Sequence, residues 1–376
     1  MSESHALKVL CVVGARPNFM KIAPLMQVFR SRGQQFEATL LHTGQHYDEA
    51  MKAAIFRQLS IPEPDIDLEV GSGSHTQQTA EIMLRFETQL NRLLPDVVLV
   101  VGDVNSTIAC ALVAVKQGVP VVHVEAGLRS FDRDMPEEVN RVLTDQISDL
   151  LFTTEPEGHE NLLREGVSDE RIQFVGNVMI DTLLANRDKA VPAQQTLAQF
   201  GANFSPDEGY AVLTLHRPSN VDDPVVLKRL VGVLADISSS VPLVFPVHPR
   251  TEQRISEAGL DNVIGNANIL RTPPLGYLQL LGLMANARVV LSDSGGIQEE
   301  TTALGVPCVT LRENTERPIT VSQGTNTIVG TDIQAIRACV EEVLTTGGKA
   351  GRIPELWDGR AADRIADTMY SHYKGR

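Results

Sequence analysis

The sequence predicts an α/β protein made of two doubly wound, Rossmann-like domains with an interdomain cleft. Short apolar runs rich in Val, Ile and Leu alternate with longer amphipathic runs along the whole chain, which is the pattern of parallel β-α-β units. Several apolar runs end in glycine or in charged residues, as strands do at the carboxyl edge of such a sheet. The length of 376 residues suits two domains of ordinary size better than one core.

The first half of the chain contains the apolar runs expected for the first sheet. We expect its strands at residues 7–13, 36–42, 96–101, 119–124, 150–152 and 172–175. Helices are expected at 75–93 and 106–117 and from Pro136 onward, because proline fits the first position of a helix. The segment 61–73, which contains two prolines and two glycines, is predicted to be a loop.

The second half repeats the same alternation. Its strands are expected at residues 210–215, 242–247, 268–270, 288–291, 307–311 and 327–329. The composition of 190–208, rich in Pro, Gly, Gln and Ala, predicts a linker. We therefore expect an N-terminal domain at 1–180, a C-terminal domain at 181–357, and a last helix at 358–376 that packs back on the first domain.

A glycine turn in the second half predicts an anion site. The run 292–300, with the sequence SDSGGIQEE, follows an apolar strand and opens a predicted helix. Gly295 and Gly296 let a phosphate approach the backbone N–H groups at the helix start, and Ser294 can cap the helix or donate a hydrogen bond. Glu300, one turn further on, can accept from ribose hydroxyls. Alternatively, the glycines only turn a strand into a helix and Glu300 is solvated.

Charged residues follow the predicted strands of the first half. Arg16 and Lys21 come after the first strand, Asp103 and Glu125 after two later ones, and Glu137 lies in the first turn of the helix that starts at Pro136. Because the ends of parallel strands meet at one sheet edge, three acids and two cations are expected to converge there. Taken singly, each acid is as well explained as a helix cap, and each cation as a surface charge.

The second half offers further candidates at strand ends. His216 and Arg217 follow the strand expected at 210–215, and Arg317 lies in the segment after the strand expected at 307–311. Arg317 would bring another guanidinium toward the glycine turn. A lone histidine is more often structural than functional, so His216 by itself decides nothing.

Composition excludes some classes of function. The net charge of −14 argues against nucleic acid, which needs a broad basic face. No apolar run approaches the about 20 residues of a membrane helix, and residues 1–8 lack a signal-peptide pattern, so we expect a cytoplasmic protein that binds no membrane. The four cysteines are far apart in the sequence, which predicts reduced, buried thiols and no metal site.

Taken together, these motifs resemble those of the non-hydrolysing UDP-N-acetylglucosamine 2-epimerases, and the resemblance covers nearly the whole chain. The motifs that carry it are Gly14-Ala15-Arg16-Pro17 with Lys21, Gly102-Asp103, His123-Val124-Glu125-Ala126-Gly127-Leu128-Arg129, Pro136-Glu137-Glu138 with Asn140-Arg141, His216-Arg217, Asp293 to Glu300, and Glu316-Arg317-Pro318. The glycine-turn motif and the motif around Glu125 are specific to this family.

The resemblance implies a fold like that of the two-domain glycosyltransferases of the B type and a homodimer. It implies interconversion of UDP-N-acetylglucosamine and UDP-N-acetylmannosamine without a nicotinamide cofactor, with the UDP-sugar and UDP as partners. The positions that match the family's functional acids and histidine are Asp103, Glu125, Glu137 and His216. Those that match its substrate-binding residues are Arg16, Lys21, Arg141, Ser294, Gly295, Gly296, Glu300 and Arg317.

The chemistry explains why acids and cations are both wanted. The C2 proton becomes acidic only as the C1–O bond to UDP breaks, so we expect elimination to 2-acetamidoglucal and re-addition of UDP.

Three alternative functions stay open. The sugar can carry other groups at C3 or C6, since the chain has Gly14-Ala15-Arg16-Pro17-Asn18 where the family often has Gly-Thr-Arg-Pro-Glu. The chain can also be a UDP-sugar glycosyltransferase or a non-catalytic UDP-sugar sensor.

Overall fold

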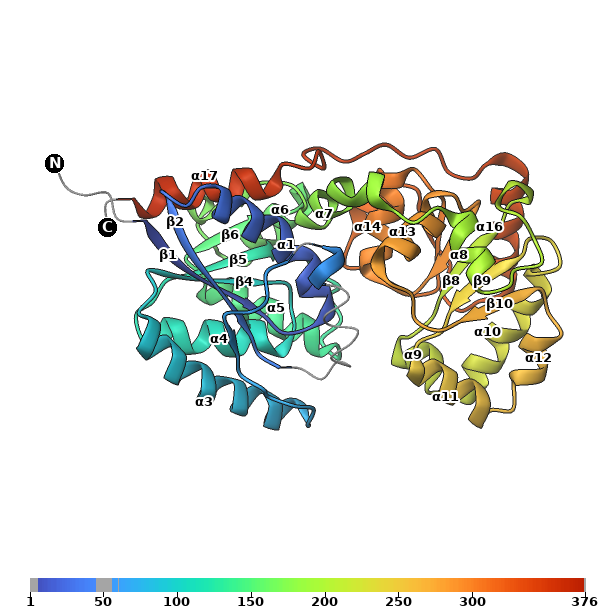
Figure 1. Cartoon of the computed structure of the whole chain (residues 1–376), viewed down its shortest axis with the longest axis horizontal. Coiled ribbons are helices and arrows are strands. Elements are labelled where there is room, and N and C mark those ends of the chain that lie inside the picture. The colour runs from blue at the N-terminus through green and yellow to red at the C-terminus, as the bar shows by residue number, and fades with distance from the viewer. Residues whose placement is uncertain (1–5, 45–55, 60, 375–376) are drawn as a thin grey trace. The chain divides into compact units, whose positions relative to one another are not determined.

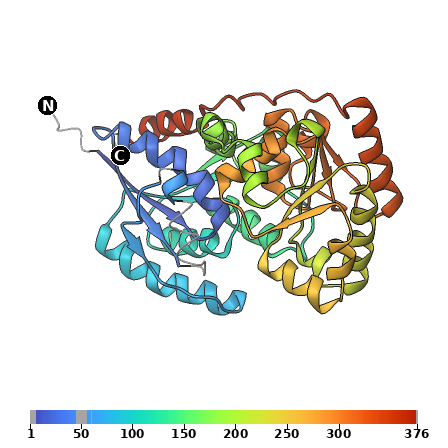
Figure 2. The same cartoon turned by 45° about the vertical axis from the view of Figure 1, so that its right-hand side comes forward.

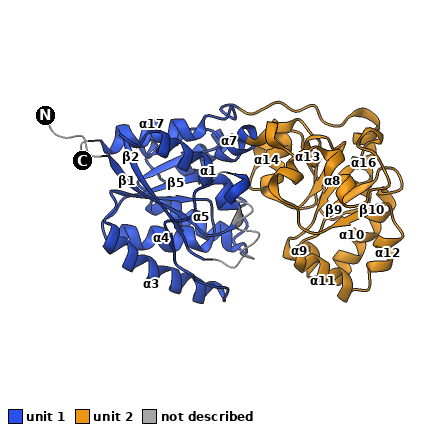
Figure 3. Ribbon diagram, viewed as in Figure 1, with its two compact units in different colours: residues 1–185, 355–376 blue, residues 186–354 orange. Residues whose placement is uncertain are grey.

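The chain forms two compact units, which Figure 3 shows in different colours. The structure is a computed structural model that describes residues 6–44, 56–59 and 61–374. One unit comprises Met1–Ala185 and Glu355–Arg376, and the other comprises Asn186–Pro354. The domain limits predicted from the sequence, and the cleft, stay predictions.

The described part of the first unit contains a seven-stranded parallel sheet in the order β3-β2-β1-β4-β5-β6-β7. Its strands are β1 (Leu7–Val13), β2 (Phe36–His42), β3 (Ile66–Asp67), β4 (Val97–Val101), β5 (Val121–Ala126), β6 (Leu150–Thr153) and β7 (Ile172–Phe174). Valine and leucine dominate β1, β4 and β5, and these strands are buried on both faces, as expected for a parallel sheet between two helix layers.

Helices cover both faces of this sheet (Figures 1 and 2). The helices of the unit are α1 (Arg16–Ser31), α3 (His75–Leu93), α4 (Asn105–Lys116), α5 (Pro136–Ile147), α6 (Pro156–Arg164), α7 (Val178–Asn186) and α17 (Ala361–Tyr373). In both views α1 and α17 lie together on one face, and α3 and α4 lie on the other. On the second face, Leu10 and Val12 of β1 belong to the same hydrophobic core as Ile82 and Phe86 of α3.

The last helix is attached to the first unit by specific polar contacts. The Asp181 carboxylate in α7 accepts hydrogen bonds from the backbone N–H groups of Ala361 and Ala362, at 3.1 and 2.7 Å, where α17 begins. Arg32 at the end of α1 makes an ion pair with Asp363 at 2.6 Å. Both contacts join segments more than 150 residues apart in the sequence.

The described part of the second unit contains a six-stranded parallel sheet in the order β10-β9-β8-β11-β12-β13. Its strands are β8 (Ala211–Thr214), β9 (Leu243–Pro246), β10 (Ile269–Thr272), β11 (Val289–Ser292), β12 (Cys308–Thr310) and β13 (Asn326–Ile328). Its helices are α8 (Ala193–Gln199), α9 (Pro218–Val221), α10 (Pro224–Ile237), α11 (Pro249–Glu257), α12 (Asp261–Gly265), α13 (Tyr277–Ala285), α14 (Gly295–Leu304), α15 (Pro318–Ser322) and α16 (Ile333–Thr346).

Alternate side chains of the central strands fill two cores in this unit. Val212 and Val290 pack with Leu197 of α8 on one face of the sheet. Leu213 and Leu291 belong to the core on the other face, with residues of α10 and α16. This alternation follows from the two-residue period of a strand. The doubly wound α/β fold predicted from the sequence is therefore confirmed for both halves.

Two local predictions were wrong. Residues 190–208 are not a linker, because they contain α8, whose Ala193 and Leu197 are buried in the core of the second unit. Ala and Gln are good helix formers, and this 193/197 spacing places both apolar side chains on one helix face. The predicted loop 61–73 contains the short strand β3, which pairs with the end of β2. A two-residue strand is too short to show a periodic pattern.

Within the described residues, none of the helices combines the length and the apolar character needed to cross a membrane. The free thiols of Cys11, Cys110 and Cys308 are buried, and Cys339 is half-buried. The predicted burial is confirmed for Cys11, Cys110 and Cys308 but not for Cys339, and all four cysteines are free of disulfides.

Candidate active site

Both sheets reverse their strand order at one point, and most of the predicted site residues lie there. In the first unit the reversal falls between the adjacent strands β1 and β4. In the second unit it falls between the adjacent strands β8 and β11. Ligands of doubly wound proteins bind outside the carboxyl ends of the strands at such a point.

Lys21 lies over the end of β4 in the first unit. A Cβ atom at Gly102, which follows β4, would be 2.8 Å from Lys21 Nζ and 3.3 Å from Asn18 Nδ2. Gly102 also has a positive φ of 66°, a backbone conformation that favours glycine. The close approach brings the Lys21 ammonium next to the backbone that carries Asp103.

The same ammonium makes a buried ion pair with Glu125. Lys21 Nζ lies 2.6 Å from Glu125 Oε1, and the two side chains are 6% and 1% exposed. Glu125 has a φ of 72° and lies where the register between β5 and β6 shifts. A positive φ is uncommon for residues other than glycine and costs free energy, and such residues cluster at functional sites.

Asp103 is held by residues of α5. Arg141 Nη2 donates to Asp103 Oδ2 in a short ion pair, and Arg141 Nη1 donates to Glu138 Oε2 at 2.9 Å. The Asn140 side chain donates to the backbone carbonyl of Asp103 at 2.9 Å. The Asp103 side chain keeps 21% of its surface exposed, so this carboxylate is fixed in position and still reachable.

The neighbouring acids of α5 have different environments. Glu138 is buried and accepts from the backbone N–H groups of Ser130 and Phe131, both at 2.9 Å. Glu137 is half-buried and bonds to none of the described residues. Because Glu137 lies one helical turn before Arg141, it shares the face of α5 that meets Asp103. Glu138 therefore anchors a loop, whereas Glu137 remains a candidate for chemistry.

Arg16 is the first residue of α1, directly after the turn that ends β1. Its side chain lies outside what the structure describes. The predicted substrate contact of Arg16 therefore stays a prediction.

Sequence reasoning gave no role to His123, which sits at the centre of a buried network. His123 Nδ1 lies 2.7 Å from Asp145 Oδ1, and Nε2 lies 2.8 Å from the carbonyl oxygen of Gly102. Both ring nitrogens of His123 therefore lie within hydrogen-bond distance of a buried oxygen acceptor. Burial alone would raise the pKa of Asp145, but His123 and Arg129 hold that pKa below its ordinary value. The pairing spans 22 residues, and no sequence motif indicated it.

In the second unit, the glycine turn has the predicted geometry. Ser294 is the N-cap of α14, and its side chain makes no capping bond to the helix. Gly295 and Gly296 form the first turn, where backbone N–H groups lack helical acceptors. Ser294 and Gly296 are partly exposed. These groups can bind an anion at the end of β11.

His216 is oriented by a buried carboxylate. Its Nδ1 atom lies 3.0 Å from Asp293 Oδ1, and the two side chains are 45% and 0% exposed. Asp293 also accepts from the backbone N–H groups of His216 and Arg217, at 3.0 and 2.9 Å. Burial alone would raise the pKa of Asp293, but its bonds to His216 and to the backbone hold that pKa below its ordinary value. Nδ1 therefore donates to Asp293, which leaves Nε2 as the ring atom available to a ligand.

Arg317 lies directly against the glycine turn. A Cβ atom at Gly295 would be 2.5 Å from Arg317 Nη1 and 2.9 Å from Glu316 Oε1. Arg317 Nη1 is 2.8 Å from Glu316 Oε1, and Arg317 Nε is 3.0 Å from Glu299 Oε1. The predicted guanidinium is therefore beside the turn, held by two carboxylates that the sequence had not marked as part of the site.

Glu300 lies one turn along α14 from Gly296 and is buried. Its carboxylate neighbours the hydroxyl of Tyr277 at the start of α13. Burial raises the pKa of Tyr277 well above its ordinary value, and the negative charge of Glu300 adds to the increase. The solvated alternative for Glu300 is therefore wrong, whereas its contact with a ribose stays a prediction.

The predicted residues thus form one set in each unit. Lys21, Asp103, Glu125 and Arg141 surround the end of β4, with Glu137 on the adjoining helix face. The glycine turn, Arg317 and His216 surround the end of β11, with Glu300 on the same helix as the turn.

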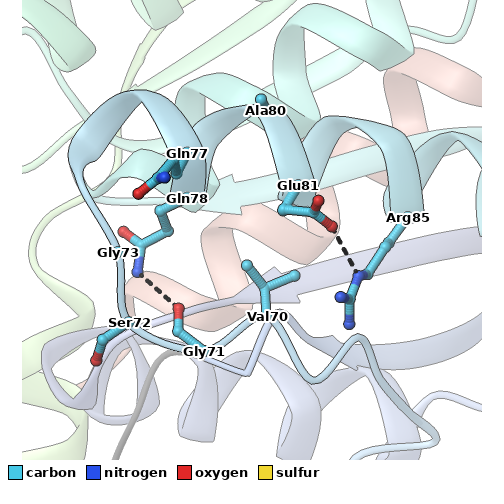
Figure 4. A pocket seen from close by; sticks show the side chains of 9 residues that line it. All are labelled: Val70, Gly71, Ser72, Gly73, Gln77, Gln78, Ala80, Glu81 and Arg85. Atoms are coloured by element: carbon cyan, nitrogen blue, oxygen red, sulfur yellow. Dashed lines mark hydrogen bonds and ion pairs between the residues drawn. The ribbon is translucent and has the colours of Figure 1, made fainter.

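A pocket elsewhere in the first unit is lined by none of the predicted site residues. This pocket of about 450 Å³ lies between segment 70–73 and α3 (Figure 4). Glu81 and Arg85, which line it, are paired with each other at 3.2 Å. Among residues 6–44, 56–59 and 61–374, no group of three His, Cys, Asp or Glu side chains is arranged to hold a metal ion.

Known proteins are similar to the chain over nearly its whole length. Residues 30–370 match the family model described as UDP-N-acetylglucosamine 2-epimerase. The UDP-N-acetylglucosamine 2-epimerase of Methanococcus maripaludis is 43% identical over 370 residues, which cover 98% of this chain and 99% of that protein. The UDP-2,3-diacetamido-2,3-dideoxy-D-glucuronate 2-epimerase of Pseudomonas aeruginosa is 39% identical, covering 96% of this chain and 99% of its own length.

A solved structure is similar over the same length. The crystal structure of the Methanocaldococcus jannaschii UDP-GlcNAc 2-epimerase in complex with UDP-GlcNAc and UDP matches with a TM-score of 0.89 and 39% sequence identity. The match covers 97% of this chain and 100% of that one.

Proposed function

The chain belongs to the family of the UDP-N-acetylglucosamine 2-epimerases, and from this premise we propose that it interconverts UDP-N-acetylglucosamine and UDP-N-acetylmannosamine. The reaction inverts C2 of the sugar. We further propose that it proceeds by loss of UDP, formation of 2-acetamidoglucal and return of UDP, with no nicotinamide cofactor.

One observation carries the proposal. Two acids, Asp103 and Glu125, are held beside cations at the switch point of one sheet, and a glycine turn with Arg317 occupies the switch point of the other. Binding of a nucleotide-sugar alone needs only the second set. The acids supply what inversion requires, namely proton transfer at carbon and negative charge near a developing cation.

The first half of the reaction is an elimination. The C1–O bond breaks, and its electron pair leaves with the β-phosphate of UDP. The C2–H bond then gives its electrons to a new C1–C2 double bond, while a carboxylate takes the proton. In the second half, C2 receives a proton from an acid on the opposite face, and the phosphate oxygen adds back to C1 on the face that it left, as the electrons of the C1–C2 double bond form the new C2–H bond. No atom is gained or lost overall, apart from exchange of the C2 hydrogen with solvent.

The ion pairs of the first unit suggest how the acids divide these roles. Lys21 makes a buried ion pair with Glu125, and Arg141 makes an ion pair with Asp103. Both are therefore suited to act as carboxylates, one as a base and one as a fixed negative charge near C1. Glu137 has no cation bonded to it among the described residues, so we assign it the acid that returns a proton.

Residues of the second unit would hold UDP while it is detached from the sugar. The amides of Gly295 and Gly296 and the Ser294 hydroxyl offer hydrogen bonds to a phosphate. Arg317 adds positive charge beside them. His216 presents Nε2, which can donate to the departing oxygen when the ring is protonated.

Incubation with UDP-N-acetylglucosamine in deuterated water tests the reaction. We expect one deuterium at C2 in the UDP-N-acetylmannosamine formed, seen by proton NMR as loss of the H2 signal. Inversion without deuterium would contradict proton exchange at C2. Release of free N-acetylmannosamine would indicate a hydrolase, and no change unless an acceptor is added would indicate a glycosyltransferase.

Isotope exchange tests the departure of UDP. Substrate labelled with ¹⁸O in the bond between C1 and the β-phosphate should scramble the label into the non-bridging β-phosphate positions, because detached UDP can rotate before it returns. Phosphorus NMR measures the scrambling. Scrambling would demonstrate detachment of UDP, and deuterium incorporation without scrambling would show that the β-phosphate does not rotate during turnover.

A second substrate class is supported by one relative. The Pseudomonas aeruginosa protein that is 39% identical is named for a UDP-sugar with altered C3 and C6 groups. Parallel assays with UDP-N-acetylglucosamine and with UDP-2,3-diacetamido-2,3-dideoxy-D-glucuronate separate the two substrates by their kcat/KM values.

We also propose a homodimer, which light scattering of the purified chain tests by mass.

A further inference from the structure

We infer that Glu316 is a positioning residue of the UDP site, whose buried carboxylate gathers the guanidinium groups of three arginines beside the glycine turn. This inference rests on the proposed function, because it assigns Glu316 a role in holding UDP. Neither the sequence motifs nor the proposed roles above use Glu316 for this purpose.

Three guanidinium groups from two segments of the chain converge on one carboxylate. Glu316 Oε1 lies 2.8 Å from Arg317 Nη1 and 3.3 Å from Arg217 Nη2, and Oε2 lies 2.8 Å from Arg312 Nη2. Arg217 follows β8, and Arg312 follows β12. Glu316 Oε1 is also 2.9 Å from the position of a Cβ atom at Gly295, so the group lies directly at the start of α14.

Because the cluster is buried, its arginines depend on the Glu316 carboxylate for a counter-ion. The side chains of Glu316, Arg312 and Arg317 are 4%, 5% and 7% exposed. Burial alone would raise the pKa of Glu316, but the three guanidinium groups hold that pKa well below its ordinary range. The carboxylate is therefore charged throughout the physiological pH range.

Arg312 depends on Glu316 most directly. Its Nη2 atom donates to Glu316 Oε2 and, at 3.2 Å, to Asn314 Oδ1. Its Nη1 atom is buried and has no partner among the described residues. Without Glu316, Arg312 would keep a buried charge with no counter-ion, which is costly.

Three guanidinium groups this close repel one another, and a carboxylate between them removes most of that repulsion. With Glu299 on Arg317 Nε, the cluster has three guanidinium groups and two carboxylates, so a positive charge is left for an anion. Donors that are already in place when negative charge develops on UDP stabilise it without rearrangement. Glu316 therefore acts on UDP through the arginines.

The test compares variants that separate charge from size. Glu316→Gln keeps the size and removes the charge, and Glu316→Asp keeps the charge on a shorter side chain. Asp261→Asn is the control, because Asp261 also holds an arginine of the second unit, Arg271, at 2.9 Å, outside the cluster. UDP affinity by calorimetry, kcat, KM and thermal unfolding are measured for each purified full chain.

Glu316→Gln should weaken UDP binding at least tenfold and lower kcat by about 10²-fold, the scale seen when one preorganised donor is removed. Glu316→Asp should recover part of both losses, and Asp261→Asn should stay within twofold of wild type. A Glu316→Gln protein that is less stable but binds UDP and turns over like wild type would overturn the inference. If wild type itself neither binds UDP nor epimerises the sugar, the proposed function fails instead.

A second variant serves if Glu316→Gln does not fold. In Glu316→Gln/Arg312→Gln the unpaired charge is removed as well, and the two amides can bond to each other. Arg217 and Arg317 still lack their shared carboxylate, so weak UDP binding is expected from a folded protein. Wild-type affinity in this double variant would refute the role of Glu316.

Discussion

Lys21 Nζ and Glu125 Oε1 lie 2.6 Å apart in a site that excludes water from both side chains. Lys21 comes from α1, and Glu125 comes from the irregular end of β5, where its φ is 72°. The pair therefore fixes a strained acid in place beside the backbone of Gly102. We expect this contact to have two roles, because the ion pair holds the fold together and the carboxylate takes part in the proposed reaction.

Substituting both residues should separate the role of the pair in stability from its role in activity. Breaking a buried ion pair from one side leaves an uncompensated charge, so Lys21→Met and Glu125→Gln should each lower the free energy of unfolding by roughly 3–5 kcal/mol. The double variant should recover most of that stability but none of the activity. Denaturant unfolding and epimerase assays on the same preparations check this. Recovery of activity along with stability would mean that the pair is structural only.

Glu137 and Glu138 are adjacent in the chain and form a natural comparison. Glu137→Gln should lower kcat by about 10²–10⁴-fold as a lost acid–base group, with little change in stability, because it bonds to none of the described residues. Glu138→Gln should lower the free energy of unfolding by about 1–3 kcal/mol, since backbone N–H groups of Ser130 and Phe131 lose a charged acceptor. Unfolding and initial-rate measurements on both variants check this, and the reverse pattern would exchange the two roles.

Asp103 can be compared with an acid at the other end of the same strand. Asp96 precedes β4 and is exposed, whereas Asp103 follows β4 and is paired with Arg141. We expect Asp103→Asn to reduce kcat by about 10²–10⁴-fold and Asp96→Asn to leave it within twofold. Deuterium exchange at C2 measured in the same variant shows whether proton abstraction itself is lost. Wild-type turnover in Asp103→Asn would remove this residue from the proposed chemistry.

The sequence was informative where chemistry depends on strand ends. A run that ends a parallel strand must lie at the carboxyl edge of its sheet, and this rule alone placed Asp103 and the Gly295 turn correctly. It could not show that Glu138, and not Glu137, is buried, because both lie in the first turn of α5. Nor could it pair His123 with Asp145 or Glu316 with Arg217, since these contacts depend on how segments 22 and 99 residues apart pack.

The same limit applies to the segment after residue 190. Its composition predicts a linker, but burial of Ala193 and Leu197 makes it part of a core. Local composition describes what a segment can form alone, and packing against α13 decides what it forms here.

Asp181 should make stability depend on pH in an unusual direction. Burial raises the pKa of its carboxyl from 3.8 to about 6 in the folded protein. The folded chain therefore binds this proton more tightly than the unfolded chain, and the Asp181 contribution to stability falls as pH rises from about 4 to about 6. The change amounts to at most about 3 kcal/mol. Ordinary paired carboxylates act in the opposite sense.

Asp181→Asn should remove this dependence and also cost stability, because the two N–H groups at the start of α17 lose a charged acceptor. Urea unfolding at several pH values between 4 and 7 gives the free energy of unfolding of wild type and variant. The difference in free energy of unfolding between wild type and Asp181→Asn should decrease as the pH rises. Asp367→Asn is the control, because Asp367 is an exposed acid on α17, the helix whose start Asp181 binds. Wild-type and Asp181→Asn curves that stay parallel across this range would show that Asp181 has the same proton affinity in the folded and unfolded chain.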